Sequence, residues 1–252
     1  MDSMHTSPPS VIAPRDERSR HGFTLTELMV VMAVIVLLAG LVGPAFQAIK
    51  GGNDLTSMAI DIKGVLDQAR AQAMAQNTYV YVGIQEVDAA TPSANDGIGR
   101  VATAMIASLD GTRQTNLSVK VSPVGKARGF DNIHLTNSSS LTNGSTMQGR
   151  PGGSLSSIPG TSVISIVDTN SAISFKWPLG TGGKYSFRKV IEFDPQGIAR
   201  FQTNTTPTTE IQPFIEIALV PSRGNQLIPS LTKNQAAIQI DGVTGRVIVY
   251  RP

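Results

Sequence analysis

Cysteine is absent from this sequence, and histidine and aromatic residues are scarce. Without cysteine the chain forms no disulfide, has no thiol nucleophile and cannot bind zinc through thiolates. His5 and His21 lie near the N-terminus, which leaves His134 as the one histidine after residue 21. No His-x-x-x-His, Gly-x-Ser-x-Gly or Ser-x-x-Lys pattern is placed to build a metal site or a nucleophile. We therefore expect a protein that is not an enzyme, that needs no cofactor, and in which His134 is a surface or half-buried side chain.

Charge is also sparse, with 15% charged residues and a formal net charge of +3. A charge this small does not by itself predict a nucleic-acid-binding protein. The hydrophobic content of 40%, with 24 glycines and 15 prolines, is typical of a β-rich globular chain with long loops. Once an N-terminal leader and an apolar span are set aside, about 200 residues remain, enough for one domain with its own core.

One long apolar run does occur, from Leu28 to Phe46, and it carries no charge. As a helix it would be about 28 Å long, close to the ~30 Å thickness of a bilayer's hydrocarbon core. Glu27 stands directly before it, and a carboxylate at the edge of a membrane span usually has a function and a partner. A cut after Gly22 would supply that partner, because it frees a cationic amine on Phe23.

The residues Gly22-Phe23-Thr24-Leu25-Thr26-Glu27 resemble the cleavage and methylation signal of prepilin-type proteins. The resemblance implies that a prepilin peptidase cuts between Gly22 and Phe23 and methylates the new amine of Phe23. It also implies that Glu27 neutralises the N-terminal amine of an adjacent subunit during assembly. The family commonly has a proline near the end of its first helix, and Pro44, which lacks a backbone donor, predicts a helix kink there.

Residues 1–22 are polar and broken by prolines, so we expect an unfolded leader peptide. Three arginines lie close before the span: Arg15, Arg18 and Arg20. Since only Lys50 follows closely, the positive-inside rule predicts a single-pass protein of the inner (cytoplasmic) membrane, with its N-terminus cytoplasmic and its C-terminal domain periplasmic. Two alternatives stay open, a secretory signal peptide cut near Gly43-Pro44-Ala45 and an unprocessed signal anchor.

Beyond the span the helical pattern continues. We expect a transmembrane and assembly helix over residues 23–50, a break at Gly51-Gly52, and a second, amphipathic helix over residues 51–77, capped by Asn53 or Asp54. Its apolar residues recur at spacings of three and four: Leu55, Met58, Ala59, Ile62, Val65, Leu66, Ala69 and Ala73. Such a stripe must be buried against another element.

After Asn77 the pattern changes to that of strands and predicts a β-rich exported domain over residues 78–252. Short runs rich in β-branched or aromatic residues predict antiparallel strands at Thr78–Ile84, Gly99–Leu109, Leu117–Val121, Ser162–Val167, Ile173–Trp177, Arg188–Phe193, Phe214–Val220, Ala236–Ile240 and Arg246–Tyr250. The segment Thr136–Gly160 is rich in Ser, Gly, Asn and Thr, and predicts a flexible surface loop. The fold class is therefore α+β, with a long N-terminal helix packed on an antiparallel sheet.

The C-terminal part resembles the H-type minor pseudopilins of type II secretion and related fimbrial minor pilins, through Phe193-Asp194-Pro195-Gln196-Gly197 and the hairpin from Ile238 to Tyr250. The closing residues from Asp241 also resemble prepilin-type protein D of the Verru/Chthon gene cassette. These resemblances imply a type IV pilin-like fold and a minor pseudopilin that assembles with other pseudopilins through its N-terminal helix. They do not explain the segment from Glu86 to Lys189.

Weaker patterns give further hypotheses. Asp88, Asn95 and Asp96 offer oxygen ligands for calcium, but their spacing matches no defined calcium loop, so we predict no metal. The run from Gly180 to Tyr185 lacks the serine or threonine of a phosphate loop and predicts a hairpin turn instead.

Arg246 and Arg251 make the end of the chain basic, and some fimbrial relatives bind DNA for uptake through a basic final hairpin. A pilin-like DNA receptor that contacts phosphates through these arginines is therefore one alternative function. A membrane-anchored carbohydrate- or protein-binding domain is the other.

Overall fold

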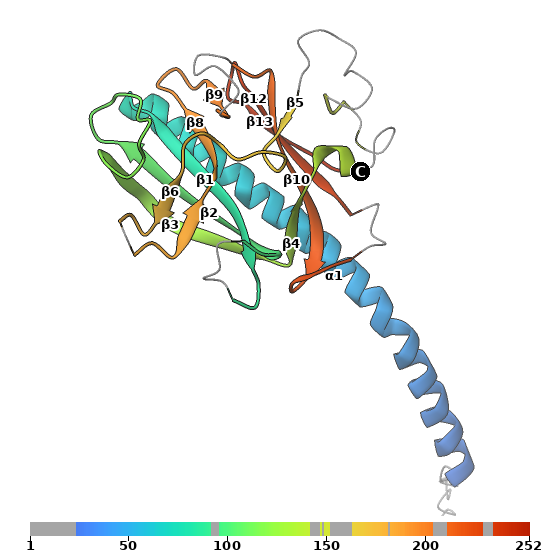
Figure 1. Cartoon of the computed structure of the whole chain (residues 1–252). Coiled ribbons are helices and arrows are strands. Elements are labelled where there is room, and N and C mark those ends of the chain that lie inside the picture. The colour runs from blue at the N-terminus through green and yellow to red at the C-terminus, as the bar shows by residue number, and fades with distance from the viewer. Residues whose placement is uncertain are drawn as a thin grey trace, which may run out of the picture. The chain divides into compact units, whose positions relative to one another are not determined.

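The computed structural model describes residues 24–91, 96–141, 147, 149–151, 163–180, 182–203, 211–228 and 234–252, without the side chains of residues 41–54. The chain divides into two compact units, residues 1–47 and residues 48–252. Each unit is described by itself below. Figure 1 colours the elements in chain order, from blue at the N-terminus to red at the C-terminus.

One helix, α1 (Leu25–Gln76), is 52 residues long and continues through Gly51-Gly52. The predicted break there, with a second helix capped by Asn53 or Asp54, is therefore wrong. A glycine costs a helix only about 1 kcal/mol relative to alanine, which burial of the following apolar stripe outweighs. The side chains of Pro44 and Phe46 lie outside the described residues, so the predicted kink and the end of the predicted span stay predictions. Among the residues whose side chains the structure describes, no helical stretch is both long enough and apolar enough to cross a membrane.

The helix α1 ends at a left-handed residue, Asn77, whose φ is 50°. The amide of Thr78 donates a hydrogen bond back to the carbonyl oxygen of Ala73 at 3.1 Å. Asparagine tolerates this conformation, and the backward bond satisfies a carbonyl that the helix leaves without a partner. The chain can therefore leave α1 and enter the first strand within a few residues.

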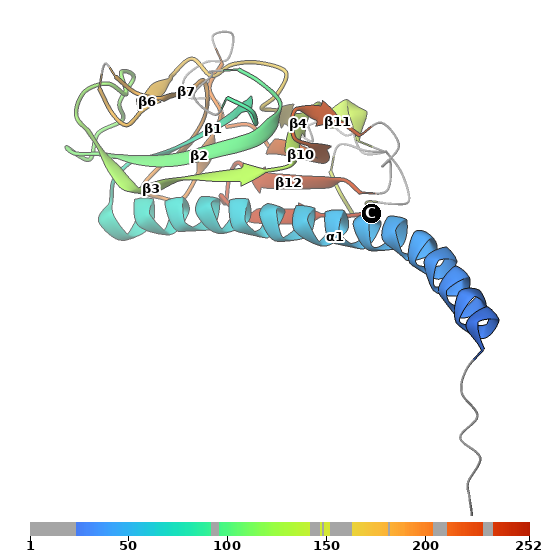
Figure 2. The same ribbon diagram turned by 90° about the horizontal axis from the view of Figure 1, so that it is seen from below.

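In the second unit, α1 lies along one side of the strands (Figure 2). The predicted stripe is confirmed, because its members fall in the main core cluster, with Met58 half-buried against it: Leu55, Ala59, Ile62, Val65, Leu66, Ala69 and Ala73. Burial of large apolar side chains contributes about 1.5–3 kcal/mol each. This stripe is what attaches the second half of α1 to the strands.

A five-stranded antiparallel sheet, here called the β1 sheet, has the order β3-β2-β1-β8-β9. Its strands are β1 (Val80–Asp88), β2 (Gly99–Ser108), β3 (Val121–Asp131), β8 (Lys189–Phe193) and β9 (Ala199–Arg200). Side chains on a strand alternate between faces. Accordingly Val82 and Ile84 join the core beneath α1, whereas Tyr81 joins a second core on the opposite face.

The second sheet, here called the β10 sheet, is built on β10 (Phe214–Arg223). One side of β10 pairs antiparallel with β12 (Ala236–Asp241), which pairs in turn with β13 (Val247–Tyr250). The other side pairs antiparallel with β4 (Ile133–Thr136) and parallel with β5 (Val163–Ser165), and β11 (Gln226–Leu227) adds a short hairpin. The parallel pairing is the one departure from the expected antiparallel arrangement among the described strands.

A separate hairpin of β6 (Phe175–Trp177) and β7 (Tyr185–Phe187) covers the outer face of the β1 sheet. Phe187 fits over Gly83 of β1, where an added Cβ would lie 2.5 Å from the ring. The residues between β6 and β7 include Gly180, Gly182 and Gly183, so the expected hairpin turn is confirmed.

One predicted strand is wrong, and part of the predicted flexible loop is structured. Residues Leu117–Lys120 precede β3 as a loop, and β3 itself was missed because Pro123, Lys126 and other exposed residues break the apolar pattern of this edge strand. Within the predicted flexible loop at 136–160, η1 (Ser138–Ser140) forms, and three described side chains are buried: Leu141, Met147 and Arg150. Residues 142–146, 148 and 152–160 lie outside the described part of the chain.

Candidate functional site

The first described residues form a reciprocal cap at the start of α1. The amide of Thr24 donates to Glu27 Oε2 at 2.9 Å, the hydroxyl of Thr24 donates to the same oxygen at 3.0 Å, and the amide of Glu27 donates to Thr24 Oγ1 at 3.2 Å. This is a capping box, in which a threonine and a glutamate three residues apart satisfy amides that the helix itself cannot. The Thr-x-x-Glu spacing was present in the sequence as a signal for this cap.

The helix that follows is apolar on all sides. Every residue from Thr24 to Gly40 is exposed. The large apolar side chains among them are Leu25, Leu28, Met29, Val30, Val31, Met32, Val34, Ile35, Val36, Leu37 and Leu38. A helix that buries one stripe shows polar residues on its other face. Residues 28–40 have no such polar face. This stretch is therefore an apolar surface on all sides of the helix, suited to contact with other apolar groups.

The start of the chain matches a known family model over residues 18–43, described as the prokaryotic N-terminal methylation motif. The chain carries a methylation motif of the prepilin type. Such a motif indicates a membrane-anchored, pilin-like substrate of prepilin peptidase. No curated protein and no solved structure matches the chain at a significant level.

Within the methylation motif, Gly22 and Phe23 lie outside the described residues, so the site of cleavage stays a prediction from the sequence. Glu27 is described, and its carboxylate lies at the start of α1 with Thr24 as its hydrogen-bond partner. A carboxylate in the first turn also interacts favourably with the helix dipole. Glu27 is thus held at the helix start while remaining exposed.

The turn that resembles H-type pseudopilins, at Asp194-Pro195-Gln196-Gly197, packs against α1. Asp194 Oδ1 accepts hydrogen bonds from the amides of Gln196 and Ile198, both at 2.9 Å, and Arg200 donates to Asp194 Oδ2 at 2.7 Å. Gly197 has a φ of 82°, and a Cβ there would lie 2.8 Å from the sulfur of Met74 in α1. Glycine is therefore required both by the turn and by the close approach of the helix.

The closing turn of the chain meets the first one at the same part of α1. Asp241 Oδ1 accepts hydrogen bonds from the amides of Val243 and Thr244, both at 2.9 Å. A Cβ on Gly245 would lie 2.0 Å from the carbonyl oxygen of Gly197 and 3.0 Å from Arg70 Cδ. The two turns that carry the C-terminal resemblance are thus in contact with each other and with α1.

A buried charge network on β8 was not predicted by any sequence pattern. Glu192 accepts two hydrogen bonds from Arg113 Nε, at 2.8 and 3.1 Å, and one from Gln202 Nε2 at 2.9 Å. Arg200 NH1 lies 3.8 Å from Glu192 Oε1. These contacts satisfy a buried carboxylate and tie the loop before β3 to the β1 sheet.

His134 is half-buried, as expected, but it has a partner that the sequence did not reveal. Its Nδ1 lies 2.9 Å from Glu86 Oε1 and 3.0 Å from Oε2. Glu86 also accepts hydrogen bonds from the amides of Gly99 and Leu135, at 3.0 and 3.2 Å. Because Glu86 lies on β1 and His134 on β4, the pair joins the two sheets. No hydroxyl bonds to His134 within the described chain, and the expectation of a non-enzyme stays a prediction.

Asp88 and Asp96, two of the three oxygen ligands offered for calcium, have other hydrogen-bond partners. Asp88 Oδ1 accepts hydrogen bonds from the amides of Ala90 and Thr91, at 2.6 and 3.2 Å. Asp96 accepts from Gln85 Nε2 at 3.2 Å, and Asn95 lies outside the described residues. Within the described ranges no group of three or more His, Asp or Glu residues is placed to hold a metal ion.

Arg246 and Arg251, the candidate DNA contacts, flank β13 at opposite ends. At about 3.3 Å per residue their Cα atoms are roughly 16 Å apart. Arg246 is exposed, whereas Arg251 is half-buried and donates to Asn234 Oδ1 at 3.1 Å. Burial lowers the pKa of the Arg251 guanidinium below its usual value. The structure therefore does not bring the two arginines together.

Proposed function

We propose that the protein is a minor pseudopilin, a structural subunit of a type II secretion or type IV pilus-like filament. The observation that carries the proposal is the methylation motif over residues 18–43. On this proposal prepilin peptidase cuts between Gly22 and Phe23 and methylates Phe23. The mature chain is then anchored in the inner membrane with its C-terminal domain in the periplasm, until it is incorporated into a filament.

The geometry at the start of α1 supports an assembly role for Glu27. The capping box holds its carboxylate within one turn of the new N-terminus, ahead of the apolar residues 28–40. In a low-dielectric environment an unpaired carboxylate is strongly penalised, and a cationic amine nearby relieves that penalty. The N-terminal amine of a neighbouring subunit is such a cation, and on this proposal it pairs with the Glu27 carboxylate.

The exposed apolar surface supports the same role. A contiguous apolar surface of this kind is stable when covered by lipid or by other apolar side chains. The same segment can therefore serve first as an anchor and then as a packing surface between subunits. The α+β architecture of residues 48–252, with an amphipathic helix beneath antiparallel strands, is compatible with a pilin-like domain.

The H-type assignment within this class rests on the C-terminal turns. The Asp194 and Gly245 turns contact each other and α1, so the residues that carry the resemblance have a shared packing role. The alternative of a DNA receptor has less support, because Arg246 and Arg251 are separated by the length of β13.

N-terminal mass spectrometry of the native protein, isolated from cells that contain a prepilin peptidase, tests the proposal. We expect a chain that begins with methylated Phe23. Replacement of Gly22→Leu should leave the leader attached, which makes that variant the matched control for cleavage. A mature start near Phe46 would instead identify a secretory signal peptide, and an intact Met1 an unprocessed anchor; either result would overturn the proposal.

A further inference from the structure

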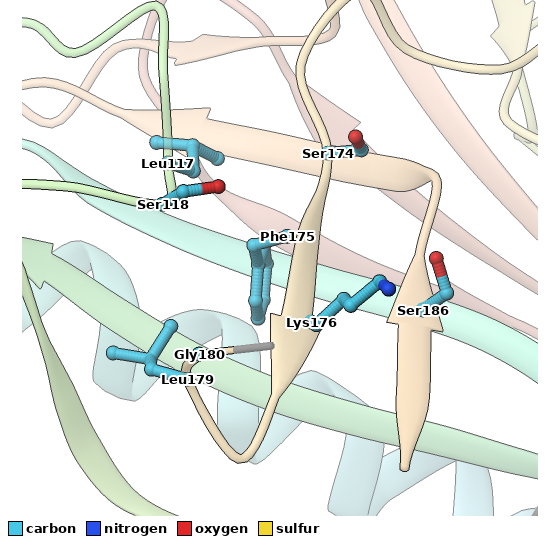
Figure 3. A pocket seen from close by; sticks show the side chains of 8 residues that line it. All are labelled: Leu117, Ser118, Ser174, Phe175, Lys176, Leu179, Gly180 and Ser186. Atoms are coloured by element: carbon cyan, nitrogen blue, oxygen red, sulfur yellow. The ribbon is translucent and has the colours of Figure 1, made fainter. Parts of the chain in front are cut away.

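A surface pocket of about 380 Å³ lies beside the β6-β7 hairpin, far along the chain from the methylation motif (Figure 3). Its lining residues come from the loop before β3, from β6 and the turn after it, and from β7: Leu117, Ser118, Ser174, Phe175, Lys176, Leu179, Gly180 and Ser186. Its volume falls near the lower end of the ~300–1,000 Å³ range of small-molecule sites. The pocket lies in the 86–189 segment that the pseudopilin resemblance leaves unexplained.

The polar side chains of this pocket are available to a ligand. Within the described residues, the hydroxyls of Ser118, Ser174 and Ser186 and the ammonium of Lys176 have no hydrogen-bond or ion-pair partner. Lys176 and Ser186 are direct cross-strand partners, and Figure 3 shows their polar ends close to each other. Each hydroxyl can donate and accept, whereas the ammonium only donates.

The apolar part of the pocket is held in place by the second core. Leu117 and Phe175 are almost fully buried, and the rings of Phe175 and Phe187 are centred 5.0 Å apart. Leu179 packs against the same cluster at its edge. An apolar base fixed by packing needs little rearrangement when a ligand binds, which lowers the entropy cost of binding.

We propose that this pocket binds an acidic sugar unit of a polysaccharide. The lining contains one cation and no carboxylate, so it favours an anionic group at Lys176. The three serine hydroxyls suit the hydroxyl groups of a sugar, and the partly exposed Leu179 suits the C–H face of its ring. The open position of the pocket at the surface leaves room for the sugar to continue into a chain.

The single tryptophan of the protein provides a reporter for this site. Trp177 follows Lys176 on β6 and belongs to the half-buried edge of the same cluster. Full-length protein in mild detergent is titrated with digalacturonate while Trp177 fluorescence is followed. We expect a saturable change with digalacturonate, and binding at least about tenfold weaker for neutral galactobiose, because a hydrogen bond to a charged group contributes roughly 1.5–3 kcal/mol.

Variants locate the binding. Lys176→Gln should weaken digalacturonate binding by about tenfold or more and abolish its preference over galactobiose. Lys126→Gln is the matched control, because Lys126 is an exposed lysine on β3 outside the pocket, and it should bind like the wild type. Circular dichroism confirms that both variants are folded. No saturable binding at millimolar digalacturonate, equal binding of galactobiose, or equal losses in the two variants would each overturn the proposal.

Discussion

Arg150 and Glu216 form an ion pair with two parallel hydrogen bonds in the interior of the protein. Arg150 Nε donates to Glu216 Oε2 at 2.9 Å, and Arg150 NH2 donates to Oε1 at 2.5 Å. The two side chains are only 5% and 0% exposed. Gln239 donates to the same carboxylate at 2.6 Å, and Arg150 also reaches the carbonyl oxygen of Ser138 at 3.2 Å. The pair thus fastens the segment after β4 to β10.

Breaking this pair should strongly destabilise the protein. Arg150→Met leaves Glu216 buried without its cation, and we expect the free energy of unfolding to fall by about 3–5 kcal/mol. The double variant Arg150→Met with Glu216→Leu should recover most of that loss, because it leaves no buried charge. Urea unfolding of the wild type and both variants measures the difference.

The exposed pair of Arg100 and Asp131 at the edge of the β1 sheet provides the control. Arg100→Met should cost less than about 1 kcal/mol, since solvent screens such pairs. Equal losses for Arg150→Met and Arg100→Met would show that the buried pair has no special role.

Glu27 should act through its charge and not only through its cap. Glu27→Gln can still form the capping box, whereas Glu27→Ala cannot. If the carboxylate pairs with an N-terminal amine, both variants should lower incorporation into filaments by about tenfold or more, with cleavage of the leader largely intact. Immunoblots of sheared filaments measure incorporation, and Thr24→Ala, which weakens only the cap, is the control. Normal incorporation of Glu27→Gln would refute pairing.

Gly245 should tolerate no side chain. Its φ of 64° disfavours other residues, and a Cβ would collide with the carbonyl oxygen of Gly197 at 2.0 Å. We expect Gly245→Ala to lower the free energy of unfolding by about 2–5 kcal/mol, the sum of backbone strain and overpacking. Gly125 has a similar φ of 72° but no atom within 4 Å of the added Cβ, so Gly125→Ala should cost only about 1–2 kcal/mol. Similar losses at the two positions would contradict the close approach.

Tyr81 should make stability fall at alkaline pH. The side chain is fully buried, the amide of Gln114 donates to its Oη at 2.7 Å, and its hydroxyl donates to the carbonyl oxygen of Gln114 at 3.3 Å. Burial raises the pKa of Tyr81 above its ordinary value of 10.0. Above pH 10 the unfolded chain therefore loses a proton that the folded chain keeps, and the stability contributed by Tyr81 declines as pH rises.

Tyr81→Phe removes this titration. At pH 8–9 we expect the wild type to be more stable than the variant by about 1 kcal/mol, because the variant lacks the hydrogen bonds of the Tyr81 hydroxyl. Between pH 10 and 11 that advantage should shrink by roughly 1 kcal/mol, since one pH unit corresponds to about 1.4 kcal/mol for a group that titrates in one state only. Urea unfolding at each pH gives the difference, in which groups common to both proteins cancel. A constant difference from pH 8 to pH 11 would contradict the buried pKa.

Sequence patterns predicted the elements whose apolar residues recur regularly. The stripe from Leu55 to Ala73 is an example, because its period follows directly from helix geometry. The strands β1, β2 and β10 are buried on both faces, and their runs of β-branched or aromatic residues predicted them. The strand β3 was missed because an edge strand tolerates proline, glycine and lysine. Gly51-Gly52 was predicted to break the helix because glycine has a low helix propensity. That prediction did not take into account the burial of the apolar stripe that follows.

The sequence by itself determined the methylation motif, the position of Glu27 within it, and the stripe that α1 buries. These features depend on residues only a few positions apart, so their spacing is sufficient to define them. Only the tertiary structure decided that Arg150 meets Glu216, that His134 meets Glu86, and that Lys176 lines a pocket with three serines. The partner of a buried charge comes from a segment that is distant in the sequence and that the fold places beside it. The periodicity of a helix or strand reflects only neighbouring residues, so it does not predict such a partner.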